Sequence, residues 1–207
     1  SSDLAQSVLR CAFFAKFLQI WPLRAVEAAM FLRFGLSNYR SINRYVELNL
    51  LASSAIKDRG CDLLRWDAGQ ADVLPVAMIY GANASGKSSL YSAVGQLKKH
   101  VVESFSRRQA TEGIERRHFA LDPDASSVPT RMDCDIIIDG VRFHFGFEFN
   151  EEEYLKEWLY TYPEGYKRVL YERSTTEVSF GKTLKGQNAK LKELMRPNSL
   201  FLSVAAQ

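Results

Sequence analysis

Alternating hydrophobic and polar positions mark much of the chain as β-structure, because a strand with one buried face repeats every two residues. The clearest alternation lies at 141–149, where four phenylalanines occupy every second position. Asp139-Gly140, a two-residue hairpin signal, joins this stretch to the apolar run before it. Strands are predicted at 31–36, 45–51, 63–66, 73–80, 134–138, 141–149, 154–162, 168–173 and 177–180.

Helical spacing occurs mainly in the middle of the chain. Apolar residues recur every three or four positions between Leu90 and Val101, which predicts an amphipathic helix that runs on toward Ser104. A second helix is predicted at 190–196, and the segment 199–204 fits either a buried strand or the start of a helix. Turn-forming residues predict loops at 52–72, apart from the short strand, and at 121–129.

Between the strand at 73–80 and the long helix lies Gly81-Ala82-Asn83-Ala84-Ser85-Gly86-Lys87-Ser88, which has the form G-x-x-x-x-G-K-[ST]. Strand, glycine-rich loop and helix in this order form a phosphate-binding loop. Glycine permits a backbone path that turns successive N–H groups toward an anion, and the helix N-terminus adds its positive dipole. Lys87 can reach the outer phosphates, and the Ser88 hydroxyl can ligate Mg²⁺. The sequence therefore predicts a nucleotide and Mg²⁺ site with Lys87 as its catalytic candidate; a glycine-containing turn without a ligand is the plainer alternative.

Other eye-catching features have structural interpretations that we favour. Asp139 ends an apolar run, as the Mg²⁺-associated aspartate of a Walker B strand does, but the hairpin signal makes it a turn residue. The phenylalanines of 141–149 are expected in the core rather than against nucleic-acid bases, and His144 between them is expected to be exposed. The basic pairs at 107–108 and 116–117 are expected to form a solvated face rather than phosphate contacts.

Composition adds little to this picture. The chain has 207 residues, of which 46% are hydrophobic and 25% charged, enough for one domain with a core. A net charge of +3 does not by itself indicate nucleic acid. The three cysteines and three histidines are scattered without a zinc or disulfide pattern, so a reducing cytoplasm is the expected location.

Residues 1–29 form a separate unit in this interpretation. Their apolar stretch at 8–21 is too short and too charged for a membrane-spanning helix, and it lacks the small-residue cleavage site of a secretory signal. Two interpretations stay open. The segment is a helix that docks on the domain or on a partner, or it is an upstream extension or a cloning remnant before Met30, where the regular pattern opens.

Three parts of the chain together resemble the N-terminal half of an ABC-type ATPase head. They are the strand at 31–34, the segment Asn38-Tyr39-Arg40-Ser41-Ile42 and the loop with its flanks. The likeness is to the SMC, RecF and OLD-like branch, and within it to bacterial and archaeal AAA-family "ATP/GTP phosphatase" proteins often found in phage-defence operons. It covers about residues 30–207. It implies an α/β fold, a P-loop NTPase lobe with a mixed sheet and an antiparallel β subdomain at about 130–181.

The same resemblance implies roles for individual residues. Asn38, Tyr39 and Arg40 would lie near the base or ribose of ATP. A glutamine well downstream of the loop would contact Mg²⁺, and Gln207 stands at about that place, with Gln187 as a second choice. The residues expected around the phosphates are Gly81, Asn83, Ala84, Ser85, Gly86, Lys87, Ser88 and Ser89.

The family pattern continues with a signature motif, a Walker B Asp-Glu and a switch His, and none of these occurs in the 207 residues. We therefore expect a fragment of a longer ATPase or a degenerate head, which binds nucleotide weakly or in part and does not turn it over alone. The full-length protein would pair its heads as a homodimer around ATP. Hydrolysis would then drive a nucleic-acid-processing or defence effector module, with DNA or RNA, or a nuclease or toxin, as partner, and without a membrane.

Two alternatives stay beside this hypothesis. The first is a nucleotide-sensing scaffold that binds a toxin or nuclease partner without efficient turnover. The second is a P-loop kinase or GTPase, although the sequence contains neither an arginine-rich lid nor the N-K-x-D motif that reads guanine.

Overall fold

The computed structural model describes residues 29–53, 63–66, 71–182 and 188–206. Its strands are β1 (Ala29–Ser37), β2 (Val46–Asn49), β3 (Leu64–Trp66), β4 (Ala71–Val73), β5 (Thr130–Ile138), β6 (Val141–Phe149), β7 (Tyr154–Tyr162), β8 (Arg168–Ser174) and β9 (Glu177–Phe180). Its helices are α3 (Lys87–Glu103), α4 (Asn188–Leu194), α5 (Phe201–Ala205) and the 3-10 turn η3 (Pro123–Ser126).

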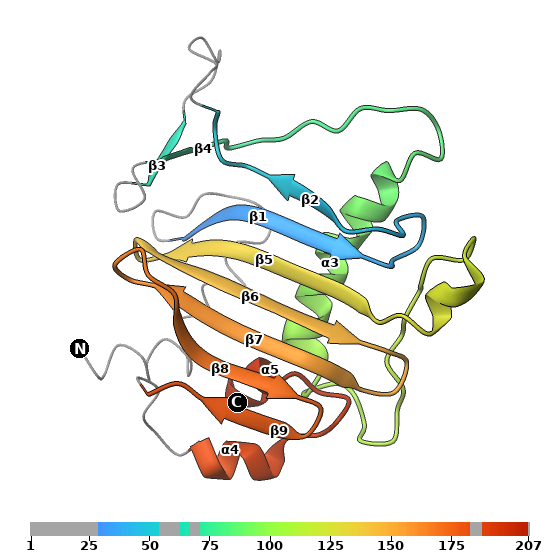
Figure 1. Ribbon diagram of the computed structural model, residues 1–207, viewed down its shortest axis with the longest axis vertical. Helices are drawn as coiled ribbons and strands as arrows, with labels where there is room; N and C mark the ends of the chain where they lie inside the picture. The colour runs from blue at the N-terminus through green and yellow to red at the C-terminus, as the bar shows by residue number, and fades with distance from the viewer. Residues whose placement is uncertain (1–28, 54–62, 67–70, 183–187, 207) are drawn as a thin grey trace.

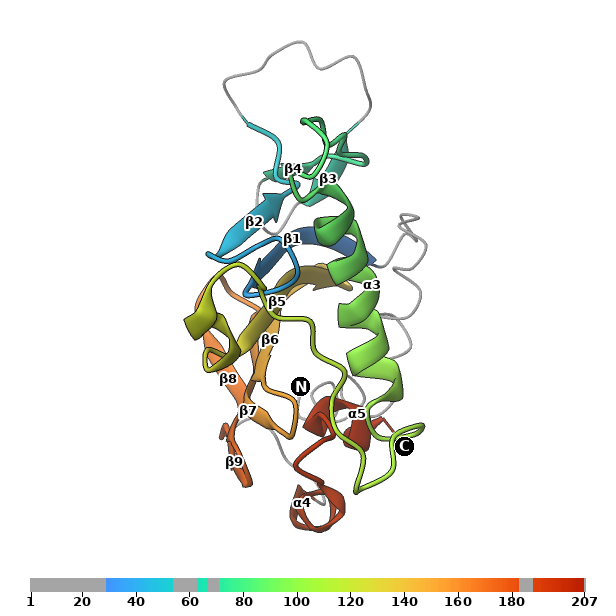
Figure 2. The ribbon, with the colours of Figure 1, turned by 90° about the vertical axis from the view of Figure 1, so that its right-hand side faces the viewer.

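One seven-stranded sheet, in the order β2-β1-β5-β6-β7-β8-β9, forms the body of the described structure. Helix α3 runs across one face of this sheet, and α4 and α5 lie at its β8–β9 end (Figures 1 and 2). β3 and β4 form a separate two-stranded ribbon. The arrangement has two layers, a broad sheet and a single long helix on one side of it.

The predicted mixed sheet is wrong for the described residues, because all the strand pairs of the large sheet are antiparallel. The segment 130–181 does not stand beside a separate sheet either. β1 pairs with β5 along nearly its whole length, from Ala29 opposite Ile138 to Ser37 opposite Arg131. The N-terminal strand β1 and the later hairpins therefore share one sheet and one core.

The core lies between the sheet and α3. The four phenylalanines of β6 point into it, and Phe145 and Phe147 have no exposed surface. Ala93, Leu97 and Val101 of α3 cover them from the other side. The prediction that this aromatic stripe belongs to the core is confirmed.

The β5–β6 turn also confirms a prediction. Asp139 has φ of 51° and Gly140 has φ of 76°, and two left-handed central residues define the type I′ turn that joins tightly paired strands. Asp139 is thus a turn residue. The prediction that His144 is exposed is wrong. Its side chain is only 14% exposed, and its Nδ1 lies 2.7 Å from Asp135 Oδ1.

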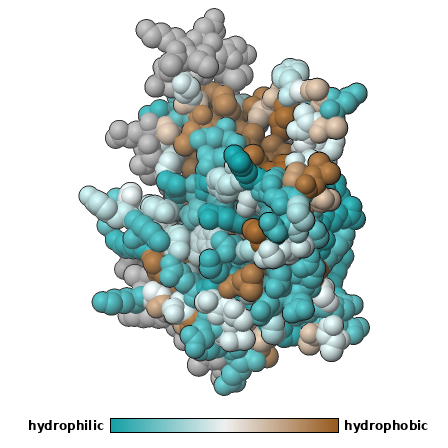
Figure 3. Space-filling model, turned by 45° about the vertical axis from the view of Figure 1, so that its right-hand side comes forward, coloured by the Kyte–Doolittle hydropathy of each residue, from teal (hydrophilic) through white to brown (hydrophobic). Residues whose placement is uncertain are grey.

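The predicted strand at 73–80 is wrong beyond Val73. The backbone N–H of Leu74 still donates to Leu50 O, but residues 75–80 belong to no strand. An apolar run gains strand structure only by pairing its backbone groups with a neighbour, and the described residues provide none here. The apolar surface gathered at the upper end of the molecule in Figure 3 overlies this part of the chain.

The remaining predictions of elements agree with the structure, with the exception of β4. Segment 199–204, for which strand and helix were both open, contains the short buried helix α5. β4 falls mostly in a predicted loop. Among the helices that the structure describes, none combines the length and apolar character that crossing a bilayer requires.

Candidate nucleotide-binding site

The glycine-rich loop has a backbone that its sequence dictates. Gly86 has φ of 97° and Ala84 has φ of 63°, both in the left-handed region. A side chain on Gly81 would place its Cβ 2.7 Å from Ser85 Oγ, which is closer than real contacts allow. Glycine is thus needed at 86 for backbone conformation, a side chain at 81 would require the Ser85 hydroxyl to move, and the loop closes as a tight turn before α3.

Helix α3 presents a bare N-terminus to this loop. Its first residue is Lys87, no side chain caps its free N–H groups, and no acidic residue stands in its first turn. The first helical hydrogen bond joins Leu90 N to Gly86 O at 3.0 Å. Uncapped N–H groups and the dipole of a 17-residue helix together favour an anion at this end.

Lys87 folds back over the loop. Its Nζ donates to Gly81 O at 2.7 Å and to Ala82 O at 2.6 Å, and it lies 3.4 Å from Ser85 Oγ. The ammonium group is therefore already held at the loop, by oxygen atoms with which phosphate oxygens would compete. Ser88 follows on the first turn of α3 with an exposed side chain, whereas Ser89 is buried.

These residues fit a nucleotide with Mg²⁺. A phosphate chain needs the backbone N–H groups, the lysine and the helix end that meet here. Mg²⁺ at such sites is held by few protein ligands, together with phosphate oxygens and water, so the Ser88 hydroxyl is a suitable ligand. Within the described ranges no group of three or more His, Cys, Asp or Glu side chains forms a metal site of its own.

The segment around Asn38 and Tyr39 packs between the loop 119–130 and α3. Asn38 is 2% exposed; its Nδ2 donates to Ala125 O at 2.7 Å and its Oδ1 accepts from Phe119 N at 2.9 Å. The hydroxyl of Tyr39 lies 3.0 Å from Ser92 Oγ on α3. These bonds give both side chains a structural role, and their contact with the base or ribose stays a prediction.

Arg40 has a different environment. Its backbone is left-handed, with φ of 51°, and its N–H donates to Arg117 O at 2.7 Å. Its Nε is buried without a hydrogen-bond partner among the described residues, and its guanidinium carbon lies 5.6 Å from the Tyr39 ring centre. The predicted role of Arg40 at the nucleotide also stays a prediction.

Sequence reasoning missed the residue that joins this segment to the loop. Ser41 Oγ lies 2.7 Å from Ser89 Oγ, and a Cβ on Gly86 would stand 3.4 Å from the same Ser41 atom. The turn at 39–42 thus borders the end of the glycine-rich loop. The only signal in the sequence was its place in the Asn-Tyr-Arg-Ser segment, because no spacing rule connects positions 41 and 89.

The Mg²⁺ candidates far down the chain, Gln187 and Gln207, lie outside the described residues. The residues brought together at the loop are therefore those of the motif itself with Ser41 and Ile42 at its edge.

Comparison with protein families finds a similarity over the middle of the chain. Residues 76–184 match a family described as "AAA domain, putative AbiEii toxin, Type IV TA system". The match begins shortly before the glycine-rich loop and extends over more than half of the 207 residues. A search of curated proteins finds no match.

Proposed function

Because the chain belongs to this AAA domain family, whose members are P-loop nucleotide-binding domains, we propose that it binds ATP with Mg²⁺ at residues 81–88 and serves ATP hydrolysis in the full-length protein. The observation that carries the proposal is the bare N-terminus of α3 behind a glycine-rich loop with Lys87 held over it. We propose further that the domain is the N-terminal lobe of an ABC-type head that pairs with a second head. That pairing and a role in defence rest on resemblance.

The residues of the chain would act by position and charge. The loop N–H groups and the α3 N-terminus hold the phosphates, and Lys87 exchanges its carbonyl partners for phosphate oxygens and offsets their charge. The Ser88 hydroxyl, exposed on the first turn of α3, is the candidate ligand of the ion. When bound, Mg²⁺ bridges phosphate oxygens and neutralises charge that develops in phosphoryl transfer.

A second function, the nucleotide-sensing scaffold, is favoured by one observation. Among the described residues no carboxylate bonds to residues 81–88, and Lys87 contacts only loop oxygens. Hydrolysis needs a group that orients or deprotonates the attacking water. A domain with a phosphate site and without that group binds ATP and signals its presence to a toxin or nuclease partner.

Calorimetry with Mg²⁺–ATP tests the binding proposal on this chain, on Lys87→Ala and on Lys99→Ala. Lys99 lies on the same helix, half exposed and paired with Glu115 at 3.4 Å, so it controls for the loss of one positive charge. We expect Lys87→Ala to weaken binding by about ten-fold or more, since it removes a charge-assisted contact, and Lys99→Ala to bind as wild type. Equal binding by all three proteins would place the nucleotide elsewhere.

Phosphate release by the full-length protein then separates the two functions. Turnover that Lys87→Ala abolishes supports the ATPase. Tight binding without turnover supports the scaffold.

A further inference from the structure

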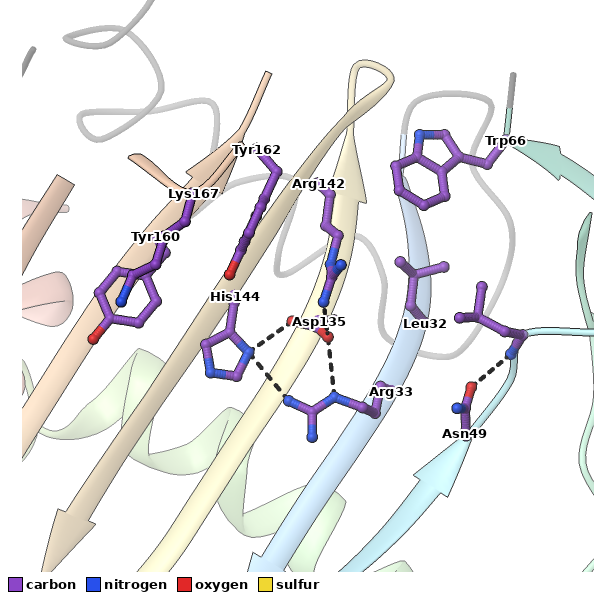
Figure 4. A pocket seen from close by; sticks show the side chains of 11 residues that line it. Leu32, Arg33, Asn49, Trp66, Asp135, Arg142, His144, Tyr160, Tyr162 and Lys167 are labelled. Atoms are coloured by element: carbon purple, nitrogen blue, oxygen red, sulfur yellow. Dashed lines mark hydrogen bonds and ion pairs between the residues drawn. The ribbon is translucent and has the colours of Figure 1, made fainter. Parts of the chain in front are cut away.

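A cavity lined by charged and aromatic side chains lies on the face of the sheet that is turned away from α3 (Figure 4). It has a volume of about 420 Å³, a size that suits one or two nucleotides or a comparable small ligand. β1, β5, β6 and β7 form its floor, and Trp66 of β3 and Lys167 stand at its rim. Neither the glycine-rich loop nor the proposed function uses this face.

Strand register explains why its side chains gather here. Asp135 pairs with His144 across β5 and β6, and His144 pairs with Tyr160 across β6 and β7. Two positions further along, Arg142 stands opposite Tyr162. Residues directly opposite or two apart share a face of the sheet, so charged and aromatic groups form adjoining cross-strand rows.

The inner end of the cavity is neutralised. Arg33 bonds to Asp133 at 2.6 Å, to Glu47 at 2.8 Å and to Asp135 at 3.0 Å. Burial raises the pKa of Asp135, but His144, Arg142 and Arg33 outweigh this and lower that pKa to about 2. These groups satisfy one another and give the cavity a fixed floor.

The outer end carries positive charge over aromatic rings. The guanidinium carbon of Arg142 lies 4.7 Å from the Tyr162 ring centre, and Lys167 Nζ lies 3.5 Å from that of Tyr160. Arg142 donates a hydrogen bond from its Nη2 to Asp135 Oδ2 at 2.8 Å. Its buried Nε has no hydrogen-bond partner in the described chain. Lys167 forms no ion pair with any residue that the structure describes.

The aromatic rings continue as a stack along the sheet. The His144 ring lies 14° from parallel with Tyr160 and 24° from parallel with Trp158, at centroid distances of 5.8 and 6.1 Å. Trp66 is held at the rim by a 3.0 Å bond from its Nε1 to Gly140 O. Flat rings and cations are the two elements with which proteins bind unpaired bases and their phosphates.

We propose that this face binds single-stranded nucleic acid. Arg142 and Lys167 then leave the ring faces of Tyr162 and Tyr160 to contact phosphates, and bases stack on these rings and on Trp66. Single strands are favoured over duplexes because only unpaired bases can lie flat on the rings. They are favoured over acidic peptides because the rings would then have no matching surface. The site is independent of the glycine-rich loop, so it can fail while ATP binding holds, and the reverse.

Fluorescence anisotropy with a labelled 12-nucleotide single strand of mixed sequence tests the proposal at several salt concentrations. The proteins are wild type, Lys167→Gln, the double variant Arg142→Gln/Lys167→Gln, and a control, Lys99→Gln/Arg107→Gln. The control removes the same charge from exposed positions on and just after α3, at the other face of the sheet. Lys167→Gln alone breaks no ion pair with a described residue, so it keeps the test valid if loss of the Arg142–Asp135 pair harms folding.

We expect the double variant to bind about ten-fold more weakly and to reduce the slope of log K against log salt concentration by about 1.4, because two phosphate contacts are lost. Lys167→Gln should show about half of that change in slope, and the control should match wild type. Three results would overturn the proposal: no binding by wild type at low salt, equal losses in the double variant and the control, or equally tight binding of duplex or of a mononucleotide. Calorimetry with Mg²⁺–ATP on the same samples reports the loop separately.

Discussion

At the scale of single residues, His100 shows how burial fixes a protonation state. It lies on the inner face of α3 with 3% of its surface exposed, and its ring contacts those of Phe147 and Phe149. Burial, with smaller contributions from Arg108 and Lys99, lowers its pKa to about 3. Its Nδ1 is 2.6 Å from the Tyr154 hydroxyl, which itself accepts a bond from Arg108, so the tyrosine donates and the neutral imidazole accepts.

This state predicts a pH dependence of stability. In the unfolded chain the His100 imidazole binds a proton below pH about 6.5. In the folded protein it stays neutral until the pH falls to about 3. Stability is therefore greatest above this window and falls as pH falls through it. Between pH 7.5 and 5.0 we expect His100 to remove about 2 kcal/mol from the free energy of unfolding. Urea unfolding of wild type and of His100→Gln measures this, and parallel pH curves for the two proteins would contradict it.

The residue scale also separates what the sequence could predict from what it could not. The motif identified Gly81, Gly86 and Lys87, because these residues are close in sequence at a fixed spacing. The two glycines also mark positions where a side chain would disturb the loop. The pairs Ser41–Ser89 and Asp135–His144 were beyond reach. The second of these depends on strand register, and a shift of one position would turn His144 to the other face of the sheet.

At the scale of elements, the buried side chain of Glu157 on β7 caps the N-terminus of helix α5. Glu157 on β7 accepts bonds from Phe201 N at 2.7 Å and from Leu202 N at 2.9 Å, the first free N–H groups of α5. It also accepts from the Tyr171 hydroxyl at 2.7 Å, and Arg173 lies 3.6 Å away. A helix of five residues with no side-chain cap of its own needs such a partner.

Glu157→Gln is predicted to destabilise the protein by about 2–4 kcal/mol, because the amide turns a donor toward groups that are all donors and leaves Arg173 without its buried counter-charge. Glu148→Gln is the matched control, since Glu148 pairs with a Lys156 side chain that is 60% exposed. We expect less than about 1 kcal/mol there. Chemical denaturation of both variants gives the comparison, and equal losses would remove Glu157 from its role as the cap of α5.

Prediction of elements succeeded where a pattern reports burial on one face. β6 alternates without a break, and its partner strand and turn were predicted with it. The run at 73–80 failed for the opposite reason: hydrophobicity says that a segment prefers to be covered, and it does not say what covers it. A strand also needs a neighbour, and neither composition nor spacing in this run identifies one.

At the scale of the whole molecule, that run leaves an apolar surface beside the nucleotide loop. The exposed fractions are 64% for Val76, 73% for Met78 and 80% for Tyr80, with Ile79 also exposed. Covering such side chains stabilises by about 1.5–3 kcal/mol each, so a contiguous exposed set promotes association. We therefore expect this chain to self-associate at high concentration and to bind apolar dyes through residues 76–80 (Figure 3).

The variant Val76→Ser/Met78→Ser/Tyr80→Ser should remain monomeric at concentrations where the wild type associates, with an unchanged melting temperature because these side chains leave the core untouched. The control Leu121→Ser/Val128→Ser/Tyr166→Ser removes exposed side chains of similar size, with 87%, 51% and 80% exposed, outside residues 76–80. Sedimentation velocity and dye fluorescence compare the three proteins. Association that persists in the first variant, or disappears equally in the control, would mean that general surface hydrophobicity governs the assembly. A loss confined to the first variant would locate the adhesive surface directly ahead of Gly81, so that whatever covers this run also holds the entrance to the phosphate-binding loop.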